Sequence, residues 1–157
     1  MIKRLLILTF FVAAFARLDA QDKITIVCPL ENGMGREAKE AYYWDPPEHK
    51  VIIMSKIDTA VRSGVPGEVV TVQVNEDNKY EIVIFFKDHY FWYNNVTRPL
   101  VRRFQKVTAS QIIGTYTHGD ELELRVYKEP KKADPEMIDP RSMLECMPPD
   151  DRPKKAF

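Results

Sequence analysis

The stretch GEVVTVQVNEDNKYEIVIFF, residues 67–86, predicts the fold most directly. Residues 67–74 alternate branched apolar side chains with polar ones, and residues 80–86 form a short run rich in branched and aromatic residues. Both patterns are typical of β-strands. The NEDN sequence at 75–78 is a turn signal between them. The stretch therefore predicts two successive strands of a sheet.

The same pattern extends outward over most of the chain. Further short strands are expected at 23–28, 50–55, 89–94, 111–117 and 121–127. Helical signal is confined to 35–44, one or two turns at most, and to 140–146, a short C-terminal helix. We find no internal repeat. The sequence therefore predicts a mainly β, single-domain protein with an antiparallel sheet or sandwich.

The two ends of the chain are expected to lie outside this domain. Residues 1–20 combine a basic start, an apolar stretch of about a dozen residues and a short polar exit, which is typical of a secretory signal peptide cleaved after Ala20. The folded domain is expected to span 21–147. The polar, proline-rich tail 148–157 is expected to be disordered. No other segment is expected to cross a membrane.

Charge argues against one class of partner. The signal segment carries three basic residues and one acidic residue, so 20 basic and 22 acidic residues remain after its removal. A net charge near −2 gives no general attraction for nucleic acid or anionic lipid, and no nucleic-acid partner is expected.

The chain contains two cysteines, Cys28 near the start of the domain and Cys146 near its end. Export places them in an oxidising compartment, where a disulfide joining the two ends of the domain is expected. Two buried thiols are the alternative. Neither cysteine has a second metal ligand at motif spacing, so a zinc or redox role has no local support.

The order of several short motifs resembles a known family. DTAV at 58–61 and VPGEVV at 65–70 are followed by a regularly spaced set of residues, by ELELRVY at 121–127, and by ADP and IDP. The spaced set is Val101, Gln105, Val107, Gln111, Ile113 and Gly114. Together they resemble the M23 zinc endopeptidases, the lysostaphin or LytM-like domains of bacterial cell-wall hydrolases, over roughly residues 27–145. The resemblance implies a LytM-type (duplicated hybrid motif-like) β domain with a secreted or periplasmic location.

When the family's active residues are aligned with this sequence one position at a time, most of them are absent. The first ligand histidine falls on His49, and the ligand aspartate falls on Ile53. One catalytic histidine falls on Asn95, and the paired catalytic and ligand histidines fall on Glu121 and Glu123. A catalytic zinc needs three protein ligands and an open position for water, and Ile53 offers no donor atom. The resemblance therefore favours a protein that has lost zinc and enzymatic activity.

Two catalytic alternatives use the same carboxylates. A divergent zinc endopeptidase acting on peptidoglycan cross-links would use His49, Glu123 and His118, with zinc as its cofactor. Without metal, Glu121 and Glu123 would stand about 6 to 7 Å apart on one strand face, a spacing compatible with an acid pair. Arg125 continues the same row, which favours a charge-compensated polar surface instead.

Aromatic and basic clusters offer other surfaces. In FFKDHYFWYNN, residues 85–95, aromatic residues occupy both faces of one strand, so one face is a binding platform or both are buried between sheets. TRPLVRRFQK, residues 97–106, concentrates four basic residues that would meet an acidic partner or simply be solvated. Phe104 and Ser110 stand where the family has turn glycines, and these two turns are therefore expected to differ in conformation.

The residues and the resemblance together predict an exported, non-catalytic M23-like module without a cofactor. It is expected to bind peptidoglycan or to regulate other cell-wall hydrolases in the bacterial envelope. The expected binding groove is lined by His49, Tyr93, Asn95, Glu121, Glu123 and Arg125. The remaining alternative is a structural envelope protein that uses its aromatic and arginine surface.

Overall fold

The computed structural model describes residues 23–38, 49–130 and 135–151 of the 157-residue chain. The expected signal peptide, most of the expected helix at 35–44 and the last six residues of the tail lie outside these ranges. The described residues form the strands β1 Met34–Glu37, β2 Lys50–Met54, β3 Ala60–Arg62, β4 Gly67–Val74, β5 Tyr80–Phe86, β6 His89–Val96, β7 Arg98–Pro99, β8 Lys106–Val107, β9 Ile112–Thr115, β10 Leu122–Lys128 and β11 Glu136–Ile138. Two short 3-10 helices, η2 Pro140–Ser142 and η3 Pro149–Asp151, follow them.

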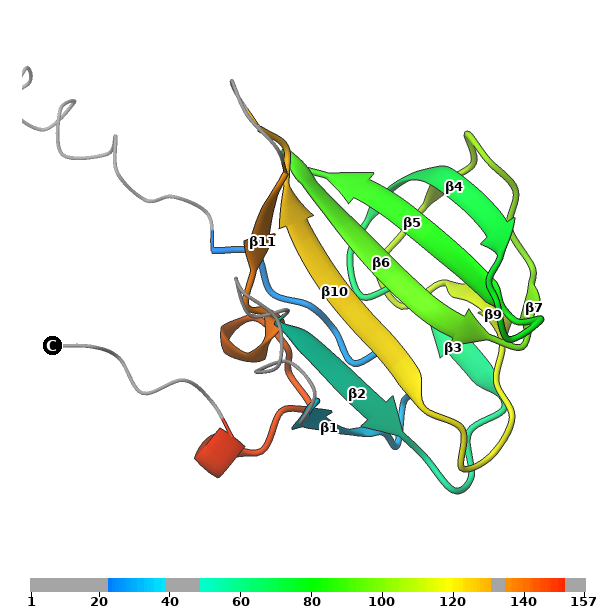
Figure 1. The fold of residues 1–157 in the computed structure, drawn as a ribbon, viewed down its shortest axis with the longest axis vertical. Helices are drawn as coiled ribbons and strands as arrows, with labels where there is room; N and C mark the ends of the chain where they lie inside the picture. Colours follow the sequence, from blue (N-terminus) through cyan, green and yellow to red (C-terminus); the bar gives the residue numbers. More distant parts are fainter. Residues whose placement is uncertain (1–22, 39–48, 131–134, 152–157) are drawn as a thin grey trace, which may run out of the picture.

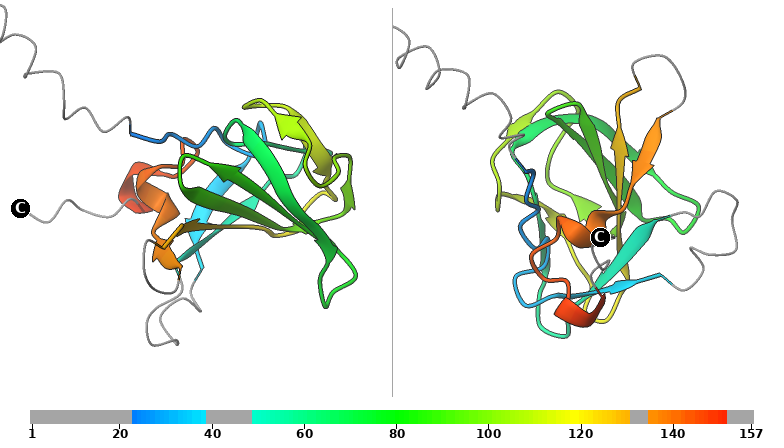
Figure 2. Two further views of the ribbon diagram at one scale, coloured as in Figure 1. Left: turned by 90° about the horizontal axis from the view of Figure 1, so that it is seen from above. Right: turned by 90° about the vertical axis from the view of Figure 1, so that its left-hand side faces the viewer.

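The strands form two antiparallel sheets. The large sheet has the order β1-β2-β10-β6-β5-β4-β8, and β11 pairs with β10 beyond the end of β2 (Figure 1). The small sheet has the order β3-β9-β7 and lies against one side of the large sheet (Figure 2, left). The mainly antiparallel β architecture predicted from the sequence is confirmed.

Alternation along the strands of the large sheet separates a buried inner face from an outer face. On β10 the side chains of Leu122, Leu124 and Val126 are fully buried, whereas Arg125 between them is partly exposed. Phe91 and Tyr93 of β6 are also fully buried and belong to the same core cluster. Because partners in an antiparallel register share a face, these residues form one continuous inner face that packs on the small sheet.

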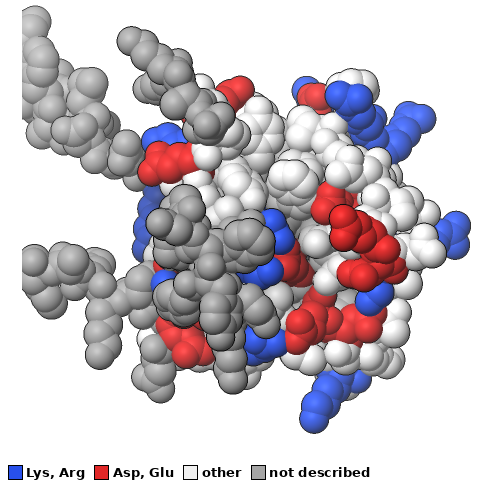
Figure 3. Space-filling model, in the orientation of Figure 1, with Lys and Arg blue, Asp and Glu red and all other residues white. Residues whose placement is uncertain are grey.

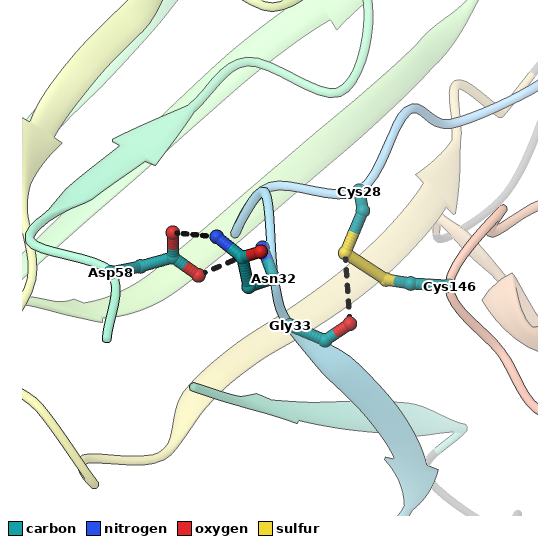
Figure 4. The surroundings of a disulfide bond; sticks show 5 residues. All are labelled: Cys28, Asn32, Gly33, Asp58 and Cys146. Carbon is teal, nitrogen blue, oxygen red and sulfur yellow. Dashed lines mark hydrogen bonds between the residues drawn. A yellow bond between two sulfur atoms is a disulfide. The ribbon is translucent and has the colours of Figure 1, made fainter. Parts of the chain in front are cut away.

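The two ends of the domain are held together beside β1. Cys28 and Cys146 form a disulfide with a Cα–Cα distance of 5.4 Å, which confirms the expected pairing (Figure 4). The flanking backbone adds an isolated parallel bridge between Ile26 and Leu144. The strand predicted at 23–28 is wrong, because only Ile26 makes a bridge and its partner is the C-terminal segment rather than a sheet strand.

Three other predicted features differ in the structure. The described part of the expected helix at 35–44 is strand β1, which pairs with β2 through residues 34–37. A side chain at Gly35 would come within 3.1 Å of Leu144, so this strand packs closely on the C-terminal segment. The expected C-terminal helix is reduced to η2, and a second 3-10 helix, η3, lies within the expected tail 148–157.

The turns at Phe104 and Ser110 keep the backbone conformation that favours glycine. Phe104 has a φ of 68° and Ser110 a φ of 65°. The expectation that these turns would change conformation is therefore wrong. Each residue instead adopts a left-handed conformation that is unfavourable for a side chain with a Cβ atom.

Candidate functional site

The outer face of the large sheet carries a group of charged side chains, here called the charged row. Its members are Arg36, Lys50, Glu121, Glu123 and Arg125. The register aligns Arg36 and Glu123 with Ile52, and Lys50 with Arg125, so these residues share one face. The sequence placed Glu121, Glu123 and Arg125 together on one side of a strand, and the structure brings them together with two basic residues from β1 and β2.

Glu123 is the most buried member of the charged row, with 7% of the residue exposed. Its carboxylate accepts a hydrogen bond from Arg125 Nε at 2.6 Å and lies 3.3 Å from Lys50 Nζ. A buried carboxylate is stable only when it is paired and hydrogen-bonded. Two cations therefore neutralise the carboxylate that the sequence resemblance aligns with a ligand histidine of the family.

Glu121 lies just before β10 and is exposed. Its carboxylate accepts a hydrogen bond from Arg36, and its backbone carbonyl accepts one from Asn95 Nδ2 at 3.0 Å. The Asn95 side chain also accepts a hydrogen bond from Asn75. Glu121 and Glu123 are thus bound to different cations, which fits the charge-compensated surface rather than an acid pair.

The backbone around Asn95 is irregular, and this irregularity sets the direction of the Asn95 side chain. The register between β5 and β6 shifts between Tyr80 and Ile82, so that two residues of β6, Asn94 and Asn95, lie opposite the single residue Glu81 of β5. Asn95 has a φ of 69°, a left-handed conformation that asparagine tolerates better than most residues. Bulges of this kind redirect side chains, and here Asn95 is directed toward the backbone of Glu121.

Tyr93 and Ile53 do not lie on this outer face. Tyr93 is fully buried, and its hydroxyl accepts a hydrogen bond from the Gly64 N–H at 2.8 Å. Burial raises the pKa of Tyr93 to about 12. Ile53 is also fully buried and is paired with Leu122 on the inner face. The prediction that Tyr93 lines a binding groove is therefore wrong.

His49 lies just before β2, which begins with Lys50 of the charged row. The His49 backbone N–H contacts Met137 Sδ at 3.0 Å, and His49 influences Asp139 electrostatically. Burial alone would raise the pKa of Asp139, but hydrogen bonds from Arg141 and the charges of Arg141 and His49 hold that pKa below its usual value. Among the described residues no hydrogen bond or ion pair joins His49 to Glu123, and their grouping stays a prediction.

The donor set does not fit a catalytic zinc ion. Glu123 is bonded to Lys50 and Arg125, Ile53 faces the core, and the backbone N–H of His49 contacts Met137. His118 is exposed in the turn before β10. Among residues 23–38, 49–130 and 135–151, no group of three or more histidine, cysteine or acidic side chains is placed to hold a metal ion.

An apolar cavity of about 480 Å³ opens on the same outer face, and is here called the aromatic pocket. It is lined by Val70, Thr71, Val83, Tyr90, Trp92, Arg103, Tyr127 and Pro135. The rings of Trp92 and Tyr127 are 5.7 Å apart, and the Tyr90 hydroxyl donates a hydrogen bond to Glu129. Trp92 is also the register partner of Arg125, so the aromatic pocket borders the charged row. Sequence alternation identified the aromatic platform, whereas it gave no reason to choose Lys50 or Arg36, whose roles depend on strand pairing.

Figure 3 shows the outer face in the orientation of Figure 1. Acidic side chains gather on its right side, next to a broad area without charged residues. A polar cavity of about 380 Å³, lined in part by Glu76, Asp77 and Glu81, also includes Asn94 of β6. The face therefore combines an apolar aromatic area with strongly polar surroundings.

The fold is that of the M23 peptidase domains. Among solved structures, the chain is similar to lysostaphin, the antimicrobial peptidase of Staphylococcus simulans, with a TM-score of 0.52 and 19% identity over 67% of this chain and 47% of that one. It therefore spans about half of that lysostaphin chain. The M23-like fold predicted from the sequence is confirmed.

Two other similar structures are covered almost completely by this chain. One is cbpa from L. salivarius REN, with a TM-score of 0.56 and 15% identity over 75% of this chain and 93% of that one. The other is the SpoIIQ–SpoIIIAH pore-forming complex, with a TM-score of 0.58 and 14% identity over 80% of this chain and 94% of that one. No protein-family model and no curated protein matches the sequence. At these identities the likeness shows the fold alone.

Proposed function

We propose that this protein is an exported, non-catalytic module of M23-like fold. In the bacterial envelope it binds peptidoglycan or regulates other cell-wall hydrolases by protein contact. The fold it shares with the antimicrobial peptidase lysostaphin and with a chain of the SpoIIQ–SpoIIIAH pore-forming complex supports this location. In the described residues no helix is long and apolar enough to cross a membrane.

The non-catalytic part of the proposal rests on the ion pairs of the Glu123 carboxylate. A ligand to a catalytic zinc must be free to donate its electron pairs to the metal. Here both carboxylate oxygens of Glu123 face cations, Arg125 at 2.6 Å and Lys50 at 3.3 Å. A divalent ion at this place would be repelled by those two cations and would find no second ligand on the outer face of β2.

The aromatic pocket supports a binding role for the outer face. Its volume lies within the range of about 300 to 1,000 Å³ that is usual for ligand sites, and its lining is mostly apolar with a few polar groups at the rim. Ring-shaped ligand groups can stack on Trp92 and Tyr127, while the charged row next to them offers hydrogen bonds. Peptidoglycan and wall-associated proteins both present such mixed surfaces.

Co-sedimentation with purified, insoluble peptidoglycan tests the proposal. We expect the protein to sediment with the wall material and the substitutions Trp92→Ala and Arg103→Gln to reduce binding severalfold. Leu100→Ala is a matched control, because Leu100 is 53% exposed but follows β7 of the small sheet. If the wild-type protein neither sediments with peptidoglycan nor changes the rate of an added wall hydrolase, the proposal is wrong.

A second assay separates this proposal from the zinc endopeptidase alternative. The protein is incubated with excess zinc and peptidoglycan, and the appearance of new amino groups is followed. We expect no increase above the rate seen with the Glu123→Ala variant. An increase that disappears in His49→Ala would favour the enzyme.

A further inference from the structure

A separate pocket of about 520 Å³ is lined by residues from both ends of the domain, from the β5–β6 hairpin and from the end of β10. We call it the basic pocket. Its polar lining consists of Lys23, Lys87, Asp88, His89, Lys128 and Ser142. These residues come from four segments that are distant in sequence, and none of them belongs to the charged row or the aromatic pocket.

The fold holds these segments together by backbone contacts. Lys87 and Asp88 form the two-residue turn between β5 and β6, with φ values of 47° and 60°. His89 follows them and is the register partner of Lys128 on β10. The Ile26 N–H donates to the Met143 carbonyl at 2.8 Å, which fixes the N-terminal segment next to η2. The convergence of the lysines is thus a property of the fold and not of one flexible loop.

Positive charge exceeds negative charge in this pocket. Three lysines contribute to its lining, against one acidic residue, Asp88, and the Lys87 ammonium lies 5.5 Å from the centre of the Phe86 ring. Within the described residues, Lys23 and Lys128 have no hydrogen-bond or ion-pair partner. The acids next to Lys128 in sequence and in register are Glu129, which accepts a hydrogen bond from Tyr90, and Glu136, which is exposed on β11. Convergent like charges raise the local potential and favour the binding of an anion.

We propose that the basic pocket binds a phosphate or phosphoester group. Lysine binds phosphate as a point charge, and phosphate offers several strong acceptor oxygens that three ammonium groups can share. The Ser142 hydroxyl can donate a further hydrogen bond. His89 Nδ1 lies 2.6 Å from the Lys87 carbonyl, which leaves its other ring nitrogen available to the ligand. The site is independent of the peptidoglycan or hydrolase contact proposed for the outer face.

Titration of the full mature chain with inorganic phosphate at constant ionic strength, followed by amide NMR shifts, tests this site. We expect saturable shifts at residues 87–89 and 142–143. The variant Lys23→Gln/Lys87→Gln/Lys128→Gln should bind at least about tenfold more weakly, because charge-assisted hydrogen bonds are lost. The matched control Arg98→Gln/Arg102→Gln/Lys106→Gln removes the same charge from the loop at 97–106 and should bind phosphate like the wild type.

Vesicles distinguish the two sources of the phosphoester. If the wild type sediments with phosphatidylglycerol vesicles but not with phosphatidylcholine vesicles, and the pocket variant does not, the group belongs to a lipid headgroup. If phosphate binds but vesicles do not, the group belongs to a soluble or polymeric phosphoester. Phosphate shifts that do not saturate, or that weaken equally in both triple variants, overturn the proposal, because the effect would then reflect net charge alone.

Discussion

Lys50 Nζ lies 3.3 Å from the carboxylate of Glu123, the residue that the sequence resemblance aligns with a metal ligand of the family. A cation of the protein itself therefore stands next to this carboxylate. Arg125 completes the neutralisation on the other carboxylate oxygen. The sequence analysis included Arg125 in the expected groove, whereas Lys50 was not recognised as part of the site. Their contact with Glu123 explains how a carboxylate can be buried there without a metal.

The first prediction concerns zinc content. After incubation with excess zinc and desalting, elemental analysis should find no stoichiometric zinc on the wild-type protein, because the Glu123 carboxylate is already paired. His49→Ala should leave this result unchanged, since among the described residues His49 interacts with Met137 and Asp139 and not with Glu123. One zinc per chain that is lost in His49→Ala would falsify the non-catalytic reading.

A double-mutant cycle tests the pairing of Lys50 with Glu123. Glu123→Gln should lower the free energy of unfolding by about 2 to 3 kcal/mol, because it leaves two partly buried cations without a carboxylate. Lys50→Met should cost less in the Glu123→Gln background than in the wild type, which gives a coupling energy of about 1 kcal/mol. Urea unfolding of the four proteins measures it. Strict additivity of the two substitutions would mean that the contact contributes nothing.

Much of the fold could be predicted because the alternation of apolar and polar residues along a strand determines which face of the strand is buried. The strands expected at 67–74, 80–86 and 121–127 agree with β4, β5 and β10 to within one residue at each end. The short segment at 23–28 has the same pattern, but its single bridge is made with Leu144. Local pattern does not say which distant segment will be the partner.

The site was harder to predict because its composition depends on register. A shift of one residue along a strand moves a side chain to the opposite face of the sheet. Motif alignment placed His49 beside Glu123, whereas the observed register places Lys50 there. The burial of Tyr93 follows from the same alternation, and the position of Asn95 depends on a bulge that no sequence signal marked.

The strained turns give a third prediction. Phe104 is 67% exposed and adopts a φ of 68°, so Phe104→Gly removes backbone strain while losing little buried surface. We expect it to raise the free energy of unfolding by roughly 1 kcal/mol in urea unfolding experiments. Phe104→Ala keeps the Cβ atom and should show no such gain, which makes it the matched control. Equal effects of the two substitutions would argue against strain.

The disulfide gives a fourth prediction. Cys28 and Cys146 are separated by 118 residues in sequence. In the chain-entropy model, closing a loop of this length contributes about 4 to 5 kcal/mol. The double variant Cys28→Ala/Cys146→Ala should therefore unfold at much lower urea concentration than the wild type. A reducing agent should destabilise the wild type and leave the double variant unchanged. If the double variant is as stable as the wild type, the Ile26–Leu144 bridge and its neighbours, and not the disulfide, hold the two ends of the domain together.

The buried Tyr93 hydroxyl gives the last prediction, a loss of stability in alkali. Burial raises its pKa from 10 to about 12, so the folded state keeps the proton more tightly than the unfolded state. Below pH 10 the hydroxyl is protonated in both states, and its stabilising contribution is fully present. As the pH rises from 10 to 12, only the unfolded state ionises, and about 2 to 3 kcal/mol of stability is lost. Urea unfolding at pH 9 and pH 11 should show this decline in the wild type.

Tyr93→Phe should be less stable at pH 9, because the Gly64 N–H loses its acceptor, but its stability should fall less between the two pH values. The same pH dependence in both proteins would assign the effect to other groups.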